Sequence, residues 1–239
     1  MTDQITTSLQ DPGFAHLTAA QMLELLRPLG FEDWESFAQS WNDLGLDMFM
    51  ADGGRYRKRR FAAFSQNSET GALTRKPHQP HYQSRDYNAL NGGIARWFLP
   101  VLPQIGEHPA LAAVLTLANR IFSGATLDSL RPRAWHVELH QFRIETGPGI
   151  EGHPTPEGMH RDGVDFVLVL LVKRQNVASG VTSIHDNSRA LIGSFILEEP
   201  LESALVDDSK VFHGVTPVQP IDPAQPAYRD VLVATYRRE

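Results

Sequence analysis

The sequence predicts an α+β protein with a mainly β core, on which helices from the first half of the chain pack. Apolar residues recur at helical spacing in the first third, the period changes to two after Arg133, and no segment repeats. We expect residues 1–130 to be mostly helical and residues 131–239 to form the β core. Because no flexible linker interrupts the 239 residues, a single domain over residues 1–239 is the simplest interpretation.

Three helices are expected in the first half. The first follows Thr18, which stands where an N-cap is expected, and stops at Gly30. A second, amphipathic segment runs from Glu32 to about Leu44, and a third helix runs roughly from Pro109 to Phe122. Polar residues and two prolines dominate between Gln66 and Asn88, which predicts a long loop.

Short runs rich in Val, Ile, Leu and Phe follow residue 133, separated by Gly, Pro, Asn or Asp clusters. Several short strands with turns between them indicate an antiparallel sandwich or barrel. The expected strands are Trp135 to Thr146, Phe166 to Lys173, Val181 to Ile184, Ala190 to Leu197, Ser203 to Val206, Lys210 to Val218 and Arg229 to Tyr236.

Composition argues against several classes of function. The 22 Lys and Arg against 28 Asp and Glu give a net charge of −6, which argues against a general nucleic-acid or membrane-surface binder. The absence of cysteine excludes thiol nucleophiles and cysteine-ligated metals, so any metal must be held by His, Asp or Glu. No apolar stretch approaches the ~20 residues that span a bilayer, and no secretory signal is visible. We therefore expect a cytoplasmic protein with neither nucleic-acid nor membrane partners.

The strongest candidate for chemistry is a metal site. His160 and Asp162 lie two residues apart just before an apolar strand, so in extended chain they can converge on one ion. His213 supplies a second imidazole from another strand-like segment. Two imidazoles and one carboxylate on one side of a metal form the facial triad of non-haem Fe(II) oxygenases, which leaves positions for a co-substrate and O₂. A His-x-Asp pair is common by chance, so the placement of both segments at strand edges carries the prediction.

Arg229 is a candidate anion anchor because it opens the last expected strand, after the second histidine. A planar guanidinium binds a carboxylate with two bonds, which suits the far end of a 2-oxo acid whose keto-acid end chelates iron. Thr235, six residues further on, shares its face of the strand. The alternative for a lone Arg at this position is a surface ion pair.

Three ordered motifs resemble those of the Fe(II)/2-oxoglutarate dioxygenases, in particular the bacterial hydroxylases of free L-amino acids of the L-isoleucine 4-hydroxylase type. The motifs are His160-Arg-Asp162-Gly163, Lys210-Val-Phe-His213-Gly-Val-Thr-Pro and Tyr228-Arg229-Asp-Val-Leu-Val. The similarity also includes Gly53-Gly54-Arg55-Tyr56-Arg57, His81-Tyr82-Gln83, Asn91-Gly92-Gly93 and Trp135-His136, and so spans most of the chain from about residue 50.

The resemblance implies a double-stranded β-helix core, iron held by His160, Asp162 and His213, and 2-oxoglutarate bound to Arg229. It also implies hydroxylation of a free aliphatic L-amino acid such as isoleucine, leucine or methionine. The cofactors are then Fe(II), 2-oxoglutarate and O₂, with ascorbate as reductant in vitro and succinate and CO₂ as co-products. The sequence departs from the family at Ser179, where a Gly-Gly turn is expected.

Four further residues are candidates for contacts with the substrate. Arg57 belongs to a run of five basic residues in six, for which a solvated basic face is the first interpretation and an Arg directed at a substrate carboxylate the second. Glu138 and His140 alternate on an expected strand and so share a face that could line a pocket. Asp165 could receive a substrate ammonium, although a hydrogen bond at the start of a strand explains it equally well.

Two other functions stay open. His136, Glu138 and His140 could bind a metal in a cupin-like site, and the chain could be a small-molecule-binding module without catalysis. The sequence also allows a homo-oligomer, because the stripe of Trp34, Phe37 and Trp41 could face either the core or a partner.

Overall fold

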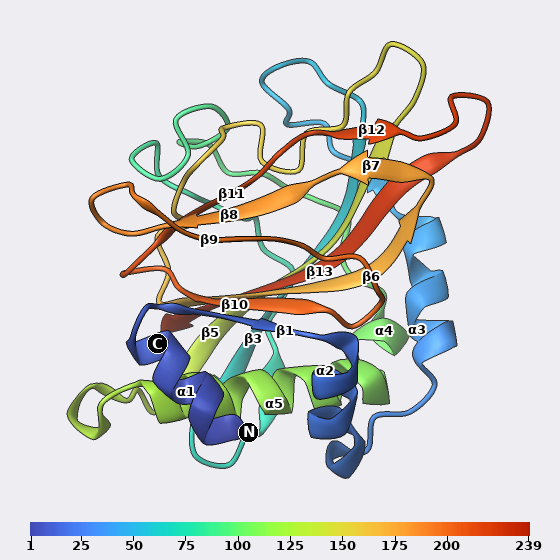
Figure 1. Cartoon of the computed structure of the whole chain (residues 1–239). Helices are drawn as coiled ribbons and strands as arrows, with labels where there is room; N and C mark the ends of the chain where they lie inside the picture. The colour runs from blue at the N-terminus through green and yellow to red at the C-terminus, as the bar shows by residue number, and fades with distance from the viewer.

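The computed structural model describes residues 1–239, and an eight-stranded sheet lies at its centre (Figure 1). The strands run in the order β1-β10-β6-β13-β5-β3-β2, with β4 beside β3, and every pairing is antiparallel. Their bounds are β1 (Phe14–Leu17), β2 (Gly45–Leu46), β3 (Arg57–Asn67), β4 (Leu73–Arg75), β5 (Ala134–Thr146), β6 (Phe166–Gln175), β10 (Ser203–Asp207) and β13 (Ala227–Arg238).

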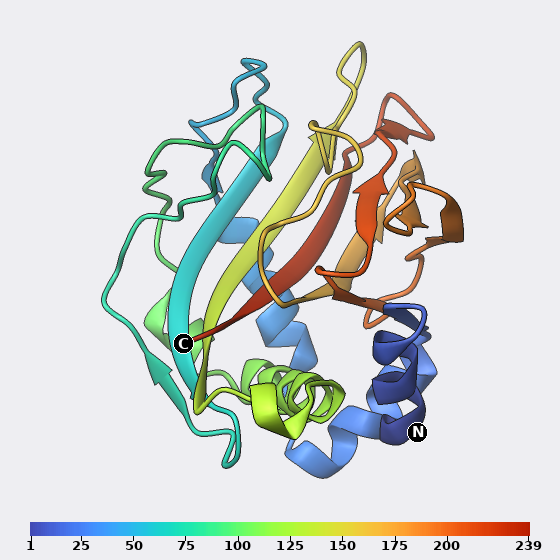
Figure 2. The ribbon, with the colours of Figure 1, turned by 90° about the vertical axis from the view of Figure 1, so that its left-hand side faces the viewer.

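Two smaller antiparallel sheets face one side of this large sheet, as Figures 1 and 2 show. One contains β11 (Phe212–Val215), β8 (Val181–His185) and β9 (Leu191–Ile196), and the other pairs β12 (Val218–Pro220) with β7 (Val177–Ser179). The facing antiparallel sheets form the double-stranded β-helix that the sequence resemblance implied.

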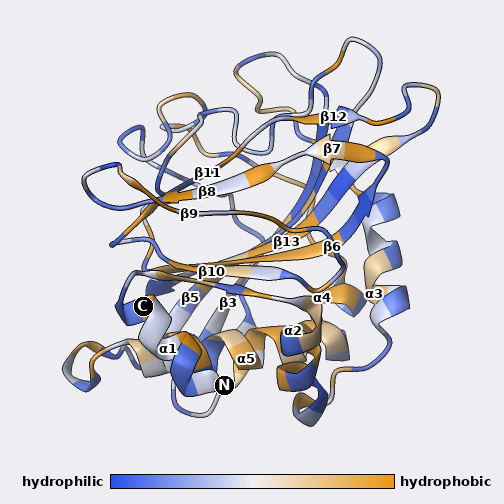
Figure 3. Ribbon diagram, viewed as in Figure 1, coloured by the Kyte–Doolittle hydropathy of each residue, from blue (hydrophilic) through white to orange (hydrophobic).

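The helices lie mainly on the opposite side of the large sheet (Figure 1). They are α1 (Thr2–Gln10), α2 (Ala19–Leu26), α3 (Trp34–Gln39), α4 (Pro103–Gly106) and α5 (Pro109–Ala125), with 3₁₀ turns at Arg27–Leu29, Ser40–Asp43 and Asp128–Leu130. A cluster of 33 buried apolar residues fills the space between helices and sheet, and hydrophobic colour is concentrated there in Figure 3. None of the helices combines the length and apolar character that crossing a membrane requires.

The local signals for the helices are confirmed. The Thr18 hydroxyl accepts a hydrogen bond from the Gln21 amide while the Gln21 side chain accepts one from the Thr18 amide, which is a capping box. Gly30 ends this segment with a φ of 74°, in the left-handed region that suits glycine. Phe37 and Trp41 are fully buried in the main core, so these members of the aromatic stripe face the core of their own chain.

The expectation that residues 1–130 are mostly helical is wrong, because strands β1, β2, β3 and β4 also lie in this part of the chain, and β3 is the longest of them. This 11-residue strand pairs with β5 in the large sheet and carries three buried arginines, Arg57, Arg59 and Arg60. The solvated basic face expected there is wrong for the same three residues. Both faces of this strand bury arginine side chains. The sequence therefore lacks the alternation of apolar and polar residues by which a strand is usually identified.

The C-terminal strands follow the prediction with two differences. The expected strand from Lys210 to Val218 is divided into β11 and β12, and the short β7 precedes β8. A turn at Ser179 and Gly180, with φ values of 62° and 74°, connects β7 to β8. The left-handed conformation at both positions explains why a Gly-Gly pair is expected here. The turn packs close to Arg229, since a Cβ added at Gly180 would lie 3.9 Å from the Arg229 Cδ atom.

Candidate functional site

A cavity of about 310 Å³ is lined by the large sheet, by strand β11 and by loop residues between 81 and 96 and between 154 and 164. Alternate residues of β3, β5 and β13 face it, because side chains alternate along a strand. Ile144 of β5 is paired with Arg57 of β3 on one side and with Arg229 of β13 on the other. Two residues along β3, on the same face, Arg59 is paired with Phe142 of β5. The sheet therefore presents cationic side chains to one cavity from two strands, β3 and β13, that are separated by β5.

His160, Asp162 and His213 meet at this cavity. The Nε2 atoms of His160 and His213 lie 3.6 and 3.5 Å from the two carboxylate oxygens of Asp162. The two histidines are held together by a pair of backbone hydrogen bonds, in which each amide donates to the carbonyl of the other at 2.9 and 3.0 Å. This bridge explains how residues from distant segments of the chain bring three ligand atoms within 4.8 Å of one another.

The surroundings of these three residues fix their orientation. The His160 Nδ1 atom lies 3.0 Å from the Gly158 carbonyl oxygen, which leaves Nε2 directed toward Asp162. The Asp208 carboxylate accepts hydrogen bonds from the backbone amides of Asp162, Gly163 and Val164 at 2.8 to 3.2 Å. The Gln83 amide donates to the backbone oxygen and to Oδ1 of Asp162, both at 3.2 Å. Such supporting contacts are typical of metal ligands.

The electrostatics of this group favour a cation. Burial lowers the pKa of His160, but the hydrogen bond and charge of Asp162 outweigh it and raise that pKa to about 9. Burial raises the pKa of Asp162, yet the two histidines hold it well below its usual range. Two imidazole nitrogens and one carboxylate, with the acidic Asp208 behind them, are a donor set that fits a divalent iron ion.

Arg229 lies on the same wall of the cavity and lacks a protein partner. It is 2% exposed, and its Nε and Nη2 atoms make no hydrogen bond in the protein. Burial and the charge of Arg174 lower its pKa to about 10, so it stays cationic at neutral pH. Leaving a buried guanidinium unpaired is costly, and a ligand carboxylate would satisfy it. Thr235 is on the same face of β13 and also lines the cavity.

A second group of two histidines and one carboxylate lines the cavity, made of His81, Glu138 and His140. His81 Nδ1 lies 2.8 Å from Glu138 Oε2, and Arg59 Nη2 lies 2.5 Å from His140 Nδ1. Burial and the charge of Arg59 hold the pKa of His140 well below its ordinary value. The histidine that joins Glu138 and His140 in this group is therefore His81 and not the expected His136. The guanidinium of Arg59 contacts the group at His140.

Most of the predicted site residues line this cavity. They are His160, Asp162, His213, Arg229, Thr235, Arg57, Glu138 and His140. Asp165 is the exception, because it does not line the cavity. Its carboxylate accepts hydrogen bonds from the backbone amide and the Nε atom of Arg238, both at 2.8 Å. The expectation that Asp165 receives a substrate ammonium is therefore wrong.

Several residues of the cavity were not predicted from the sequence. Arg59, His81, Gln83, Arg96 and Glu157 all line it. His81 and Gln83 belong to a motif that carried the family resemblance, so a signal for them was present. Arg59 was concealed within the basic run, and no local pattern marks Arg96 or Glu157.

Comparison with known proteins supports the chemistry of this cavity. The model of a family described as 2OG-Fe dioxygenase matches residues 38–235 of the chain. The chain belongs to this family. It is therefore an oxidoreductase that depends on Fe(II), 2-oxoglutarate and O₂.

Three relatives illustrate the similarity. The 3(1)-hydroxy-L-isoleucine 4-dioxygenase of Pantoea ananatis is 26% identical over 213 residues, which cover 87% of this chain and 82% of that protein. The L-isoleucine-4-hydroxylase of Bacillus thuringiensis is 30% identical over 158 residues, which cover 65% of this chain and 64% of that protein. The crystal structure of a bsmA homolog from Methylobium petroleophilum PM1 is 38% identical with a TM-score of 0.89, covering 99% of this chain and 93% of that one.

Proposed function

We propose that this dioxygenase hydroxylates a free aliphatic L-amino acid of the isoleucine, leucine or methionine type, with His160, Asp162 and His213 as iron ligands. The observation that carries the proposal is the presence of this ligand group and an unpaired, buried Arg229 in one cavity. The names of the Pantoea and Bacillus relatives support the substrate class. The small volume of the cavity suits a single amino acid beside 2-oxoglutarate.

In this proposal each side chain has a defined task. Bound iron supplies the oxidation of 2-oxoglutarate to succinate and CO₂ together with hydroxylation of the substrate. Arg229 binds the distal carboxylate of 2-oxoglutarate and so orients it, and Thr235 lies on the same face of the strand. Val231 and Val233 lie between these two on that face and keep water from the reacting groups.

Release of succinate tests the proposed function. Purified protein with Fe(II), ascorbate and 2-oxoglutarate is incubated with each of the twenty amino acids, and succinate and the product mass are measured. We expect one aliphatic amino acid to raise succinate release and to gain about 16 mass units, as expected for insertion of one oxygen atom. If no amino acid stimulates succinate release, the substrate class is rejected.

Other features of the protein stay predictions. The cytoplasmic location rests on the sequence alone. The aromatic stripe no longer supports a homo-oligomer at Phe37 and Trp41, because both face the core of their own chain. The expectation of no nucleic-acid partner is supported by the burial of Arg57, Arg59 and Arg60, because guanidiniums inside the protein cannot form a basic surface for phosphates.

A further inference from the structure

Three buried guanidiniums lie at the β3 side of the cavity, and one buried carboxylate pairs with two of them. Arg57, Arg59 and Arg96 are 6%, 3% and 2% exposed, and all three line the cavity. Asp47, itself 2% exposed, lies 2.8 Å from Arg57 Nε and 3.6 Å from Arg59 Nη1. Asp47 thus pairs closely with Arg57 and more loosely with Arg59, and Arg96 has no carboxylate within salt-bridge distance.

The free donors of Arg59 and Arg96 are available to a ligand. The Nε atoms of both residues make no hydrogen bond in the protein, and Arg96 Nη2 reaches only the Gln83 side-chain oxygen, at 3.4 Å. The Arg59 guanidinium lies close to the rings of Phe98 and Phe142, at 3.7 and 4.3 Å from their centroids. Because rings cover the plane of the guanidinium, its edge is the part that can donate hydrogen bonds, which is the geometry that a carboxylate requires.

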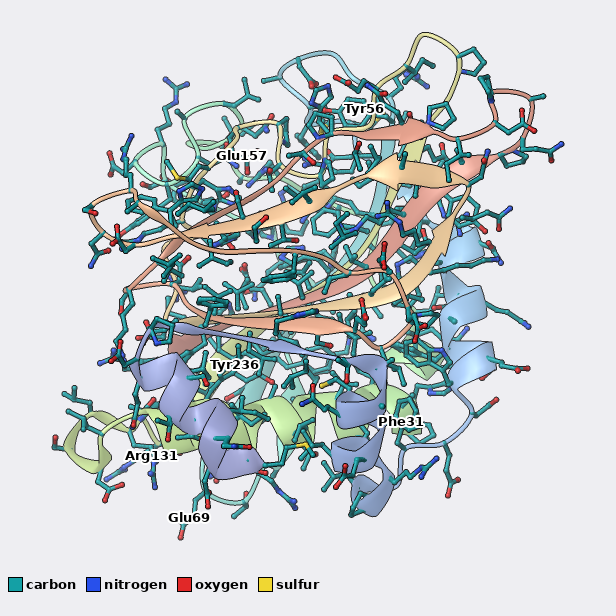
Figure 4. The ribbon with its side chains drawn as sticks, in the orientation of Figure 1. Phe31, Tyr56, Glu69, Arg131, Glu157 and Tyr236 are labelled. Atoms are coloured by element: carbon teal, nitrogen blue, oxygen red, sulfur yellow. The ribbon has the colours of Figure 1, made fainter.

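An acid with one unpaired carboxylate oxygen lies in the same cavity. Glu157 Oε2 is buried without a hydrogen-bond partner, while Oε1 lies 3.6 Å from His160 Nε2. Glu157 lies among the loops on the side of the molecule away from the helices (Figure 4). Arg96 and Glu157 are near enough for the acid to act on the pKa of Arg96, which burial and Arg57 lower and Asp47 and Glu157 raise. The cavity thus contains unpaired guanidinium donors, on Arg59 and Arg96, and an unpaired carboxylate oxygen, on Glu157.

We propose that Arg59 and Arg96 bind the α-carboxylate of the amino-acid substrate and that Glu157 accepts its ammonium group. The inference rests on the proposed function and specifies how the substrate is held. The substrate site is separate from Arg229, because Arg57 and Arg229 stand in one register row with β5 between their strands, about 10 Å apart. Two carboxylates, one from the substrate and one from 2-oxoglutarate, then have separate cations.

Substrate analogues test the inference with the unmodified protein. The amino acid that stimulates succinate release most strongly is compared with its primary amide, which lacks the carboxylate charge, and with the corresponding des-amino acid. Binding is measured calorimetrically to protein loaded with Mn(II) and 2-oxoglutarate, which avoids turnover. We expect each analogue to bind about 100-fold more weakly, the usual cost of leaving a buried charge unpaired. An amide that binds as well as the amino acid would overturn the inference.

Variants identify the residues. Arg96→Met should raise the KM for the amino acid about 100-fold, and Glu157→Gln should do so to a similar extent, while the KM for the co-substrate stays within about threefold. Lys58→Met is the matched control, because Lys58 lies between Arg57 and Arg59 on the opposite face of β3, paired with Glu145 at 2.7 Å. An unchanged KM for the amino acid in a folded Arg96→Met protein would overturn the inference.

The two proposals fail in different ways. If the proposed function is wrong, no amino acid stimulates succinate release by the unmodified protein. If only the substrate site is wrong, stimulation is seen but the amide binds normally or Arg96→Met leaves the KM unchanged. Should Arg96→Met fail to fold, Glu157→Gln still tests the assigned residues, and the analogue series still tests whether both charged groups of the substrate are recognised.

Discussion

The two groups of two histidines and one carboxylate in this cavity contain the same donor types but have opposite surroundings. Around His160, Asp162 and His213 the nearest further charges are the carboxylates of Asp208 and Glu157. Around His81, Glu138 and His140 the nearest further charge is the Arg59 guanidinium. The pKa of His160 is accordingly raised to about 9 even though burial opposes it, whereas burial first and then Arg59 lower the pKa of His140.

This difference shows that a set of donors does not by itself define a metal site. Neighbouring negative charge strengthens the binding of a divalent ion, and neighbouring positive charge weakens it. In a buried cavity these interactions are only weakly screened by solvent. The group at His160 therefore suits a cation, and the group at His140, beside the Arg59 guanidinium, suits an anionic part of the substrate. The cupin-like interpretation, with a metal at Glu138 and His140, lacks electrostatic support for the same reason.

Removing one histidine from each group tests this contrast most directly. His213→Ala should abolish stoichiometric Co(II) binding and lower product formation at least about 1000-fold, because loss of a direct ligand costs more than the 10- to 100-fold typical of outer contacts. His140→Gln should still bind one Co(II) per chain, because this group does not hold the metal. Metal content is measured after dialysis, together with the visible absorption of bound Co(II). The reverse pattern, with metal retained in His213→Ala and lost in His140→Gln, would establish a cupin-like site.

The two arginine sites can be separated in a second experiment. Arg229→Gln should raise the KM for the co-substrate 2-oxoglutarate about 100-fold, because the variant loses a buried, charge-assisted contact with the distal carboxylate. The KM for the amino acid should change less than about threefold, since its carboxylate is assigned to the β3 side of the cavity. Steady-state succinate release with each reactant varied in turn measures both constants. A variant whose KM for the co-substrate is unchanged rejects Arg229 as the anchor.

The same contrast explains what could be predicted from the sequence. His160 and Asp162 are two residues apart and His213 lies in a recognisable strand, so local spacing and family motifs were sufficient for the metal group. Arg59 and Arg96 come together only because β3 pairs with β5 in one register and the loop before α4 folds back on it. Register depends on contacts between distant segments, and a buried basic strand lacks the alternation that identifies strands in a sequence. For Asp165 the sequence left two interpretations open, and its pairing with Arg238, which lies more than 70 residues further along the chain, was not visible locally.

Gln83 connects the two regions and provides a third test. Its amide donates to Asp162 Oδ1 at 3.2 Å, and its oxygen accepts from Asn88 at 3.1 Å and Arg96 at 3.4 Å. We expect Gln83→Leu to weaken Co(II) binding about 10- to 100-fold, the usual effect of losing a hydrogen bond to a ligating carboxylate. The KM for the amino acid should rise as well, because Arg96 loses its hydrogen-bond partner.

Two measurements define the role of Gln83 as a positioning residue. Calorimetric titration with Co(II) reports the metal affinity without turnover, and Leu90→Ala, an exposed change in the same loop, is the control. Unaltered Co(II) affinity in a folded Gln83→Leu protein would show that the hydrogen bond to Asp162 does not position the ligand.

The pH dependence of stability gives the smallest expected effect. Burial keeps His140 neutral in the folded protein, with its pKa well below the ordinary value, whereas the unfolded chain takes up a proton near pH 6.5. The unfolded state therefore binds more protons below pH 6.5, and the free energy of unfolding falls as the pH falls. Between pH 6.5 and 5.5 this one histidine should cost about 1 kcal/mol.

His160 does not mask the effect. Its folded pKa of about 9 is above the unfolded value, so the stability that it contributes is complete below pH 6.5 and is lost only as the pH rises toward 9. Urea unfolding of metal-free protein at pH 6.5 and 5.5 should therefore show a decrease that is about 1 kcal/mol smaller in His140→Gln than in the unmodified chain. If the free energy of unfolding decreases equally in the two proteins between pH 6.5 and 5.5, His140 is protonated in the folded state. The Arg59 guanidinium, which distinguishes the second group from the metal group, then does not control the charge of His140.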